Sequence, residues 1–449
     1  MNAYSLRRQC VVLNVNGIGA MSMPPRRLAV VAIVAVTIAA AGAVVAQQRG
    51  AEAGPRKMAA GAPATAPAES ADARAVRADL EAYVAAVTKK DFKTAATYVD
   101  AERMVQEIEA AGMVAKLSGE QRTKFVSAID GQIEKGIRDP ANVLAMTVIR
   151  VKKVHVLAGG REAMVYLKGA HASEAFMARW WMVKSSSGRW RTYDVEDASR
   201  FGVRLSMVMC GAVATTDSGF RPAAWVKDLQ EIEPLLKAQG DGDVQKVEQM
   251  LPRLEKAGFP SGVQAMVLTV KGITLATQQK NAEAEAAFAQ AARLDPDEPM
   301  ALYLRATMYN VGMQKPEKGA ELARQFLDRL GDDAMAFEQL AIALRIMHRD
   351  AEAIEALGRG NDDAPAEIEL LAGYANWAAA AQPEDVTRRI ERALSSVADP
   401  KAATETLAED MGNRNAMDCL IAAYKKAKPG DAQTLAKLEE IKKTIPPTP

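Results

Sequence analysis

Two carboxylates, Asp194 and Glu196, stand two residues apart in the strand-like stretch RWRTYDVED. Side chains at this spacing share one face of a β-strand. A pair of carboxylates on one face is suited to general acid–base chemistry when the surroundings raise the pKa of one member. The simpler interpretation is a solvated strand end, and we favour it.

A pair of tryptophans precedes these carboxylates. Trp180 and Trp181 are adjacent in FMARWWMVK, so they point to opposite faces of the predicted strand. One of them is expected in the core, and the other would line a ligand cup or a partner surface. Tyr166 lies on the predicted strand 162–168. His155 lies on the predicted strand 145–157 and is expected to be structural or exposed rather than a general base. The main candidate pocket residues are Trp180, Trp181, Asp194 and Glu196.

The rest of the sequence carries no recognisable catalytic motif. GIGA at 17–20 and GDGD at 240–243 lack the context that a phosphate-binding glycine loop requires. There is no Ser-centred elbow, no His-x-x-x-His motif and no Cys–His nucleophile pair. Three cysteines and three histidines do not suit a disulfide framework or a structural zinc site, and Cys210 and Cys419 are expected as buried, unpaired thiols. We therefore predict a protein that is not an enzyme and needs no cofactor or metal.

Helices followed by strands must position the candidate pocket. From 75 to 138 apolar residues recur mainly at helical spacing, with a break at Lys89–Asp91 and a capping box of Ser118 and Gln121 before the helix at 118–138. After Pro140 the period changes, and strands are predicted at 145–157, 162–168, 176–184 and 190–195. Residues 75–214 are thus expected to form an α+β domain with helices on one face of a four-stranded antiparallel sheet.

This order of elements resembles the NTF2-like superfamily, in which a broken helix pair precedes a curved sheet. The stretch DLEAYVAAVTKKDFKTAATYVD and the closing strand RWRTYDVED carry the resemblance, which covers about 75–210. The strand that the family commonly inserts among its helices is not visible before residue 145. The resemblance implies a cone-shaped fold that houses an enzyme pocket, a ligand cup or only a contact surface.

The second half of the chain shows an internal repeat. From Trp225 onward the period is helical, and within 265–298 small and large apolar residues recur at spacings of three and four on two successive helices. A proline, which cannot continue a helix, ends this unit. The pattern resembles the tetratricopeptide repeat (TPR), whose small residues let two helices approach closely. The matching residues are Leu268, Gly272, Leu275, Ala284, Phe288, Ala291 and Pro296.

The same spacing returns at intervals of 34 and about 35 residues. The second helix of the second unit, 319–330, needs an insertion of one or two residues to align. A looser fourth unit uses Leu370, Tyr374 and Trp377, with Tyr374 where a small residue is expected. The helix pairs predicted at 225–257 and 402–443 are expected to cap the array. The sequence therefore predicts an all-α TPR solenoid over 223–445. The further matching residues are Leu302, Ala306, Tyr309, Leu340, Ala341, Ala353 and Leu357.

The N-terminal region, 1–46, reads as an export leader. Arg26 and Arg27 precede an uncharged apolar run at 28–45, which is followed by Ala46. The run is also long enough to cross a bilayer once, so cleavage near Ala46 and retention as a single transmembrane anchor both stay open. In either topology the arginines remain inside and the rest is exported. Residues 47–74, rich in Ala, Pro and Gly, are expected to be a disordered tether.

Composition and architecture together favour one class of function. With 57 basic and 56 acidic residues the net charge is +1, so no global field attracts nucleic acid, and membrane contact is expected only through the N-terminal segment. A helical solenoid offers a concave face suited to protein or peptide partners. We therefore expect a non-enzymatic, extracytoplasmic scaffold that binds protein partners through its TPR array. The alternative is a small-molecule-binding or enzymatic NTF2-like cup, with the array as stabiliser or dimer contact.

Overall fold

A computed structural model describes residues 69–138, 149–171, 174–197, 204–216, 220–397 and 399–446. The chain forms two compact units that divide between Ala301 and Leu302. The predicted leader and most of the predicted tether lie outside the described residues. The sequence predicts a tether that extends to residue 74, but 71–74 are the first turn of a helix that Ser70 caps, so that end of the prediction is wrong. Among the residues described, no helix combines the length and the apolar character needed to cross a membrane.

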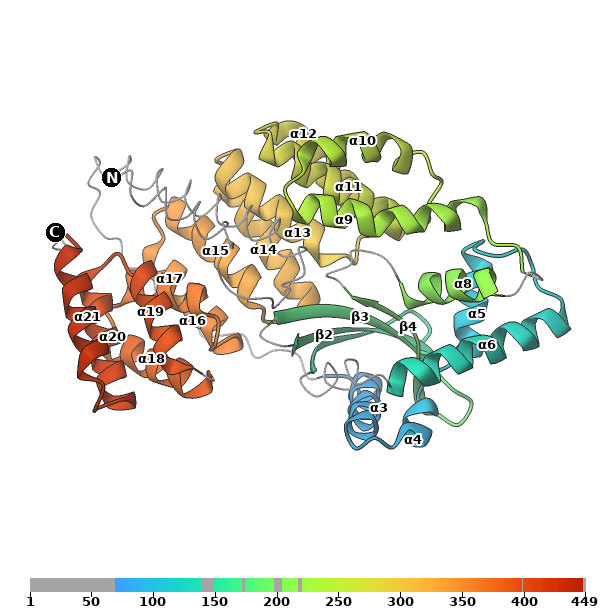
Figure 1. The fold of residues 1–449 in the computed structure, drawn as a ribbon, viewed down its shortest axis with the longest axis horizontal. Helices are drawn as coiled ribbons and strands as arrows, with labels where there is room; N and C mark the ends of the chain where they lie inside the picture. Colours follow the sequence, from blue (N-terminus) through green and yellow to red (C-terminus); the bar gives the residue numbers. More distant parts are fainter. Residues whose placement is uncertain are drawn as a thin grey trace. The chain divides into compact units, whose positions relative to one another are not determined.

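The described part of the first unit begins with four helices (Figure 1): α3 (Ala71–Thr88), α4 (Phe92–Ala96), α5 (Ala101–Ala110) and α6 (Gly119–Arg138). The predicted break after α3 is confirmed, since Lys90 has a φ of 60° there. The predicted capping box is confirmed as well. The Ser118 amide donates to Gln121 Oε1 at 3.0 Å, and the Gln121 amide donates to Ser118 Oγ at 3.3 Å. Both helix boundaries thus follow from local side-chain chemistry.

The strands form one antiparallel sheet in the order β1-β2-β3-β4. Gly159 and Gly160, with φ values of 94° and 66°, connect the first two strands, and positive φ is a conformation that glycine adopts without strain. The predicted four-stranded meander is confirmed for the described residues, although 145–148 lies outside them. The strands are β1 (Arg150–Val156), β2 (Glu162–His171), β3 (Glu174–Lys184) and β4 (Trp190–Asp197).

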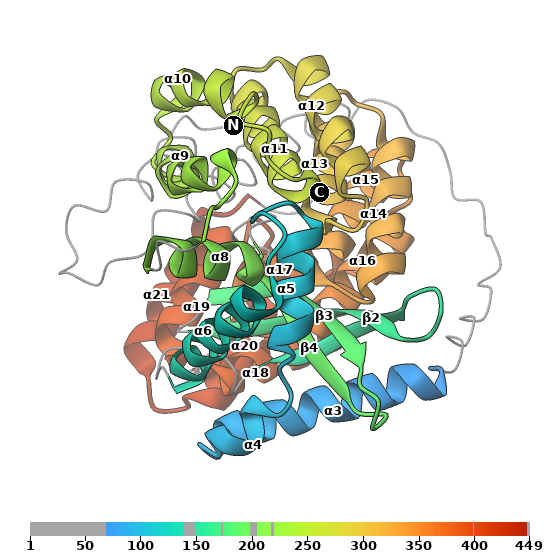
Figure 2. The ribbon, with the colours of Figure 1, turned by 90° about the vertical axis from the view of Figure 1, so that its right-hand side faces the viewer.

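One face of the sheet is apolar and covered by helices. Val165, Trp180 and Val195 lie in register across β2, β3 and β4 on this face. Trp180 packs edge-on against Tyr83 of α3, with ring centroids 5.6 Å apart. Both views place α3 below the sheet (Figures 1 and 2). Trp180 is therefore the core tryptophan of the pair, and the opposite face of the sheet is polar.

The apolar core of the first unit continues into the first helices of the predicted repeat array. One cluster of buried side chains runs from Val76 of α3 through the sheet to Val263, Met266 and Val270 of α11. The boundary between the two units consequently lies within the helical array. The remaining helices of this unit are α8 (Leu205–Thr216), η2 (Ala224–Glu231), α9 (Ile232–Gly240), α10 (Val244–Leu254), α11 (Ser261–Thr277) and α12 (Asn281–Leu294).

Helix α13 (Pro299–Thr307) crosses the boundary, and the described part of the second unit is helical. It has its own apolar core, which extends from Ala334 to Ile445. Three helices, not the predicted pair, occupy the region 402–443. The helices are α14 (Pro316–Leu330), α15 (Ala334–Ile346), α16 (Asp350–Asp363), α17 (Ile368–Ala378), α18 (Pro383–Ser396), α19 (Pro400–Asp410), α20 (Arg414–Ala427) and α21 (Ala432–Thr444).

The insertion predicted in the second repeat takes the form of a π-helical turn. This turn, η3 (Met308–Gly312), directly continues α13. A π turn places an extra residue in a helix without breaking it. With one residue inserted, Gly319 of α14 occupies the position that Ala284 holds in the first repeat. The repeat register is thus restored in the second helix of the pair.

Candidate functional site

The first repeat brings its two helices into close contact at a glycine. A Cβ atom added to Gly272 of α11 would lie 2.5 Å from the ring of Phe288 on α12. Phe288 is 1% exposed, so its ring has little room to move. The small residue at this position is therefore required by the packing of the pair.

The other predicted repeat residues lie mostly in the same kind of environment. Those of helix pairs α13–α14 and α15–α16 are buried, except that Leu340 is half-buried. In the first repeat Leu275 is half-buried and Pro296 is exposed. The buried positions are Leu268, Gly272, Ala284, Phe288, Ala291, Leu302, Ala306, Tyr309, Ala341, Ala353 and Leu357.

In the fourth helix pair, α17–α18, Tyr374 does not occupy the position expected for a small residue. The small residue Ala375 follows it on α17 and is fully buried, as are Leu371 and Ala378 at helical spacing. Tyr374 instead packs toward the preceding helix, where a Cβ on Gly358 of α16 would lie 3.5 Å from its ring. The repeat pattern of α17 is therefore shifted by one residue from the predicted Leu370–Tyr374–Trp377.

Three carboxylates form a row across the second unit, which we call the acidic row: Glu338 of α15, Glu369 of α17 and Asp410 of α19. Within the part of the chain that the structure describes, none of the three has an ion-pair partner. Burial, followed by repulsion from Glu367 and Glu369, raises the pKa of Glu338 to about 7. Burial and repulsion from Glu369 also raise the pKa of Asp410. The row is thus a set of like charges without compensation.

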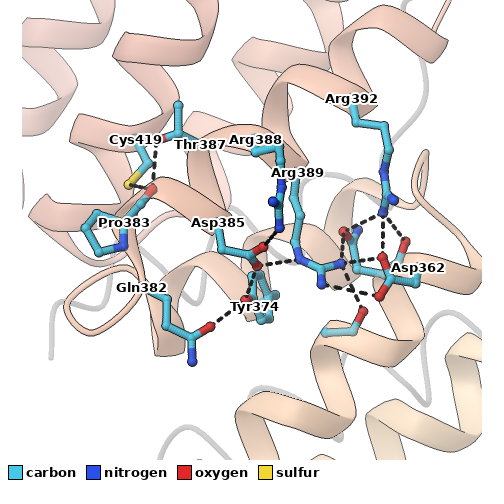
Figure 3. A network of polar contacts seen from close by, with 12 residues as sticks. Asp362, Tyr374, Gln382, Pro383, Asp385, Thr387, Arg388, Arg389, Arg392 and Cys419 are labelled. Atoms are coloured by element: carbon cyan, nitrogen blue, oxygen red, sulfur yellow. Dashed lines mark hydrogen bonds and ion pairs between the residues drawn. The ribbon is translucent and has the colours of Figure 1, made fainter.

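A polar network fastens α16, α17 and α18 to one another (Figure 3). Arg389 lies at its centre: Nε donates to Asp385 Oδ2 at 2.7 Å, and Nη1 donates to Asp362 Oδ1 at 2.7 Å. Nη1 also donates to the Gly358 carbonyl at 3.1 Å. Tyr374 Oη lies 3.0 Å from Gln382 Oε1 and donates to Asp385 Oδ2 at 2.5 Å. The network thus ties a repeat to its successor.

The charges in this network set the pKa values of its members. Burial raises the pKa of the Asp385 carboxyl, but hydrogen bonds from Tyr374 and Arg389 outweigh burial, so the net shift is downward. Asp362 shows the same balance, with Arg389 and Arg392 outweighing burial. The pKa of Tyr374 rises to about 12, chiefly through burial. Near neutral pH the two carboxyls therefore stay ionised and Tyr374 stays protonated, so these groups are unsuited to proton transfer.

The polar face of the sheet in the first unit holds a second cluster, which we call the ionic cluster: Arg179, Glu196, Asp295 and Glu298. Arg179 Nη2 donates to Glu196 Oε2 at 2.6 Å and to Asp295 Oδ2 at 2.7 Å, while Nη1 donates to Asp295 Oδ1 at 3.0 Å. The side chains of Arg179 and Glu196 are each 1% exposed. The guanidinium thus neutralises carboxylates from both the sheet and the turn after α12.

Trp181 and Asp194 border the ionic cluster on the same face. The guanidinium of Arg204 lies 4.0 Å from the centroid of the Trp181 ring, and that of Arg179 lies 5.2 Å from it. Asp194 accepts hydrogen bonds from the Ser206 hydroxyl at 2.7 Å and from the Ser206 amide at 3.0 Å. Burial raises the pKa of Asp194 to about 6, although Arg204 and these hydrogen bonds oppose the shift.

The candidate pocket residues therefore have other surroundings than the sequence suggested. Asp194 and Glu196 do share one face, but each is 1% exposed, so the favoured interpretation as a solvated strand end is wrong. Their charges face Arg179 and Arg204, which offsets part of the free-energy cost of burying them. Trp181 stacks with the same arginines. This face is filled by side chains of the protein itself.

The remaining candidate residues are His155, Tyr166 and the two cysteines. The ring of His155 packs edge-on against Tyr166, with centroids 5.5 Å apart. Cys210 and Cys419 are both buried and unpaired, as expected. Among the described residues no cluster of His, Cys, Asp and Glu is arranged to hold a metal ion.

Sequence reasoning missed the residues that organise both charged clusters. Arg179 and Asp295 are far apart in the sequence, and nothing in their local pattern indicates that they meet. Glu338 and Glu369 lie on separate helices, and no motif in the sequence around either residue indicates that they come close together. One signal was available: placing Glu338 and Glu369 in the repeat register assigns them to the first helices of successive pairs.

Comparison with known proteins gives a distant structural likeness. No family model matches the chain, and no curated protein matches it significantly. The MamA RS-1 ArsTM double mutant aligns with a TM-score of 0.31 and 16% identity, over 44% of this chain and 94% of its own. A crystal structure of MamA aligns with a TM-score of 0.27 and 17% identity, over 38% of this chain and 91% of its own. Both alignments cover less than half of this chain.

Proposed function

We propose that this protein is a non-enzymatic scaffold outside the cytoplasm, which binds protein partners through a TPR-like array. The observation that carries the proposal is the recurrent packing of helix pairs around small buried residues. Gly272 against Phe288, Ala341 and Ala353 at full burial, and Ala375 one period later all support it. Repeated helix pairs of this kind build extended surfaces that suit other polypeptides.

The acidic row supports the second unit as the place of contact. Glu338, Glu369 and Asp410 belong to three different helices, yet they repel one another. Like charges that lack partners inside a chain destabilise it and are favourable only when an external group neutralises them. A partner segment rich in lysine or arginine would supply that neutralisation.

The location outside the cytoplasm rests on the sequence of the leader alone. Arg26 and Arg27 followed by the apolar run 28–45 support export, with the chain either released near Ala46 or held by one helix. Protease should therefore digest the protein from residue 47 onward when it is added to cells whose outer layer is permeabilised and whose cytoplasmic membrane is intact. Protection of the chain in those cells would contradict export.

Site-specific photocrosslinking in the producing cell tests the binding surface. Probes would replace Glu369 and Asp410, which are exposed members of the acidic row, in the full-length chain. Matched control probes would replace Glu355 on α16 and Glu384 on α18, which are exposed carboxylates on the second helices of their pairs. Each replacement removes one exposed charge, so the two sets differ mainly in position.

The proposal predicts a discrete cross-linked protein for the probes in the acidic row and none for the control probes. The same product should appear at both row positions, because one partner segment would pass along the row. Equal labelling at all four positions would indicate non-specific contact and contradict the proposal. Labelling only at the control positions would place the binding surface on the other helices.

A further inference from the structure

The turn after α12 does more than end a helix. In the sequence Leu294–Asp295–Pro296 indicates only a stop, yet two residues of this turn contact the sheet. Asp295 accepts two hydrogen bonds from Arg179, and the carbonyl of Asp297 accepts one from Tyr166 Oη at 2.7 Å. Both contacts come from the polar face of the sheet.

Arg179 and Asp295 form a bidentate ion pair. Its two terminal nitrogens face the two carboxylate oxygens of Asp295 at 3.0 and 2.7 Å, an arrangement that fixes direction as well as distance. One of the same nitrogens also binds Glu196, which fixes the guanidinium relative to β4. Burial raises the pKa of Asp295, but the hydrogen bonds and charge of Arg179 outweigh it and lower the pKa overall. The pair is therefore charged on both sides.

The turn also positions the start of the next helix, α13. Glu298 accepts hydrogen bonds from the amides of Met300 at 3.0 Å and Ala301 at 2.8 Å, which are the first free amides of α13. Glu298 is 6% exposed, and burial raises its pKa to about 7. A continuous series of contacts thus leads from β3 through Asp295 and the turn to the first residues of α13.

Polar side-chain contacts join the turn to the sheet. The main core of the first unit extends only as far as α11, whereas Ala291 and Ala301 belong to a separate, small apolar cluster with Ala265 and Leu268. A segment held by a few charged hydrogen bonds opens at a lower free energy than the core around it. We therefore expect the turn to open separately from the core, at a lower free energy.

We propose that the polar face of the sheet is a docking site for the turn 295–298, and that Arg179 is the positioning residue that latches the turn, and with it the start of α13, in one orientation. The latch releases locally: the turn leaves the sheet while the strands and α11 stay folded. The sheet thereby anchors the end of the first helix pair within the first unit. This inference does not depend on the proposed scaffold function.

Native-state hydrogen exchange on the full-length protein tests the latch. Asp295→Asn keeps the shape of the side chain and leaves the Arg179–Glu196 pair in place, but it removes the charge that faces Arg179. In the wild-type protein we expect the amides of Met300 and Ala301 to exchange through an opening of lower free energy and weaker denaturant dependence than β2 amides such as Val165 and Leu167. Asp295→Asn should make Met300 and Ala301 exchange at least tenfold faster. Asp228→Asn is the matched control, because Asp228 forms an ion pair with the exposed Arg253 in the same unit, and it should alter neither set.

A double-mutant cycle with Arg179→Met separates the latch from general destabilisation. In the Asp295→Asn background Arg179→Met should accelerate exchange at Met300 and Ala301 less than it does in the wild-type background, because the charged contact is already lost. Additive acceleration would overturn the proposal. Exchange of Met300 and Ala301 with the same opening free energy and denaturant dependence as Val165 and Leu167 in the wild-type protein would also overturn it, since that is global unfolding. If Arg179→Met does not fold, Asp295→Asn alone decides, and unchanged exchange at Met300 and Ala301 overturns the latch.

Discussion

Arg179 in the first unit and Arg389 in the second unit both bridge two carboxylates, but their surroundings differ. The side chains around Arg179 are 1% and 11% exposed, whereas those around Arg389 are 53% and 23% exposed. Water therefore screens the second network and is excluded from the first. The acidic row is a third case, in which the carboxylates have no ion-pair partner among the described residues. The comparison suggests a division of roles: buried paired charges hold the fold, and unpaired exposed charges are available for binding.

The largest effect should come from breaking the buried pair. Arg179→Met leaves Glu196 and Asp295 without compensation in the interior, so the free energy of unfolding of the first unit should fall by about 3–5 kcal/mol. Chemical denaturation followed by tryptophan fluorescence measures this, because Trp180 and Trp181 lie on the same strand. A loss below about 1 kcal/mol would mean that the ionic cluster is not the buried network described here.

Helix packing in the first repeat should give the next largest effect. Gly272→Ala brings a methyl group against the buried Phe288 ring, so we expect a loss of roughly 1–3 kcal/mol. Gly131→Ala on α6 is the matched control, because no atom lies within 4 Å of its added Cβ. That variant should stabilise the protein by about 0.5–1 kcal/mol through lower chain entropy. If the two variants behaved alike, the close approach of α11 and α12 would be wrong.

Glu298 makes the first unit sensitive to pH. Its pKa is raised from 4.5 to about 7 in the folded protein, so the folded state binds more protons than the unfolded state between these values. Stability from this group is full below about 4.5 and is lost as the pH rises toward 7. Glu298→Gln, which resembles the protonated acid, should therefore be more stable than wild type at pH 8, by on the order of 2 kcal/mol.

The difference between Glu298→Gln and wild type should narrow to almost nothing at pH 5. Thermal unfolding at the two pH values provides the measurement. The groups that act on Glu298 from the packed elements are Arg179, Asp295 and Glu196, and all three are unchanged in this variant. A variant that is less stable than wild type at pH 8 would show that the Glu298 carboxylate stabilises the fold.

A smaller effect is expected in the open network of the second unit. Arg389→Met removes the links to Asp362 and Asp385, but both carboxylates are partly exposed and regain water. The free energy of unfolding should fall by about 1 kcal/mol. Limited proteolysis between α16 and α18 follows the same change locally. A loss as large as that of Arg179→Met would remove the distinction between the two arginines.

Local patterns in the sequence predicted the elements well, and long-range contacts set the limits of prediction. The capping box at Ser118, the glycine turn at 159–160 and the close approach at Gly272 all depend on residues near one another or on a strong spacing, and each is present. The sequence could not show that Arg179 meets Asp295, so it assigned Glu196 to solvent. In the same way, the spacing of α17 alone did not distinguish Tyr374 from Ala375, because both are buried.

The measurement that tests the division of roles most directly is a charge reversal in the acidic row. The variant Glu369→Lys with Asp410→Lys changes two exposed side chains that have no ion pair among the described residues, so the unfolding temperature of the full-length protein should stay unchanged or rise slightly. In cells, cross-linking from a probe at Glu338 should then lose its protein product. A product that persists, or a protein that unfolds while the product is lost, would contradict the view that these charges serve binding and not folding.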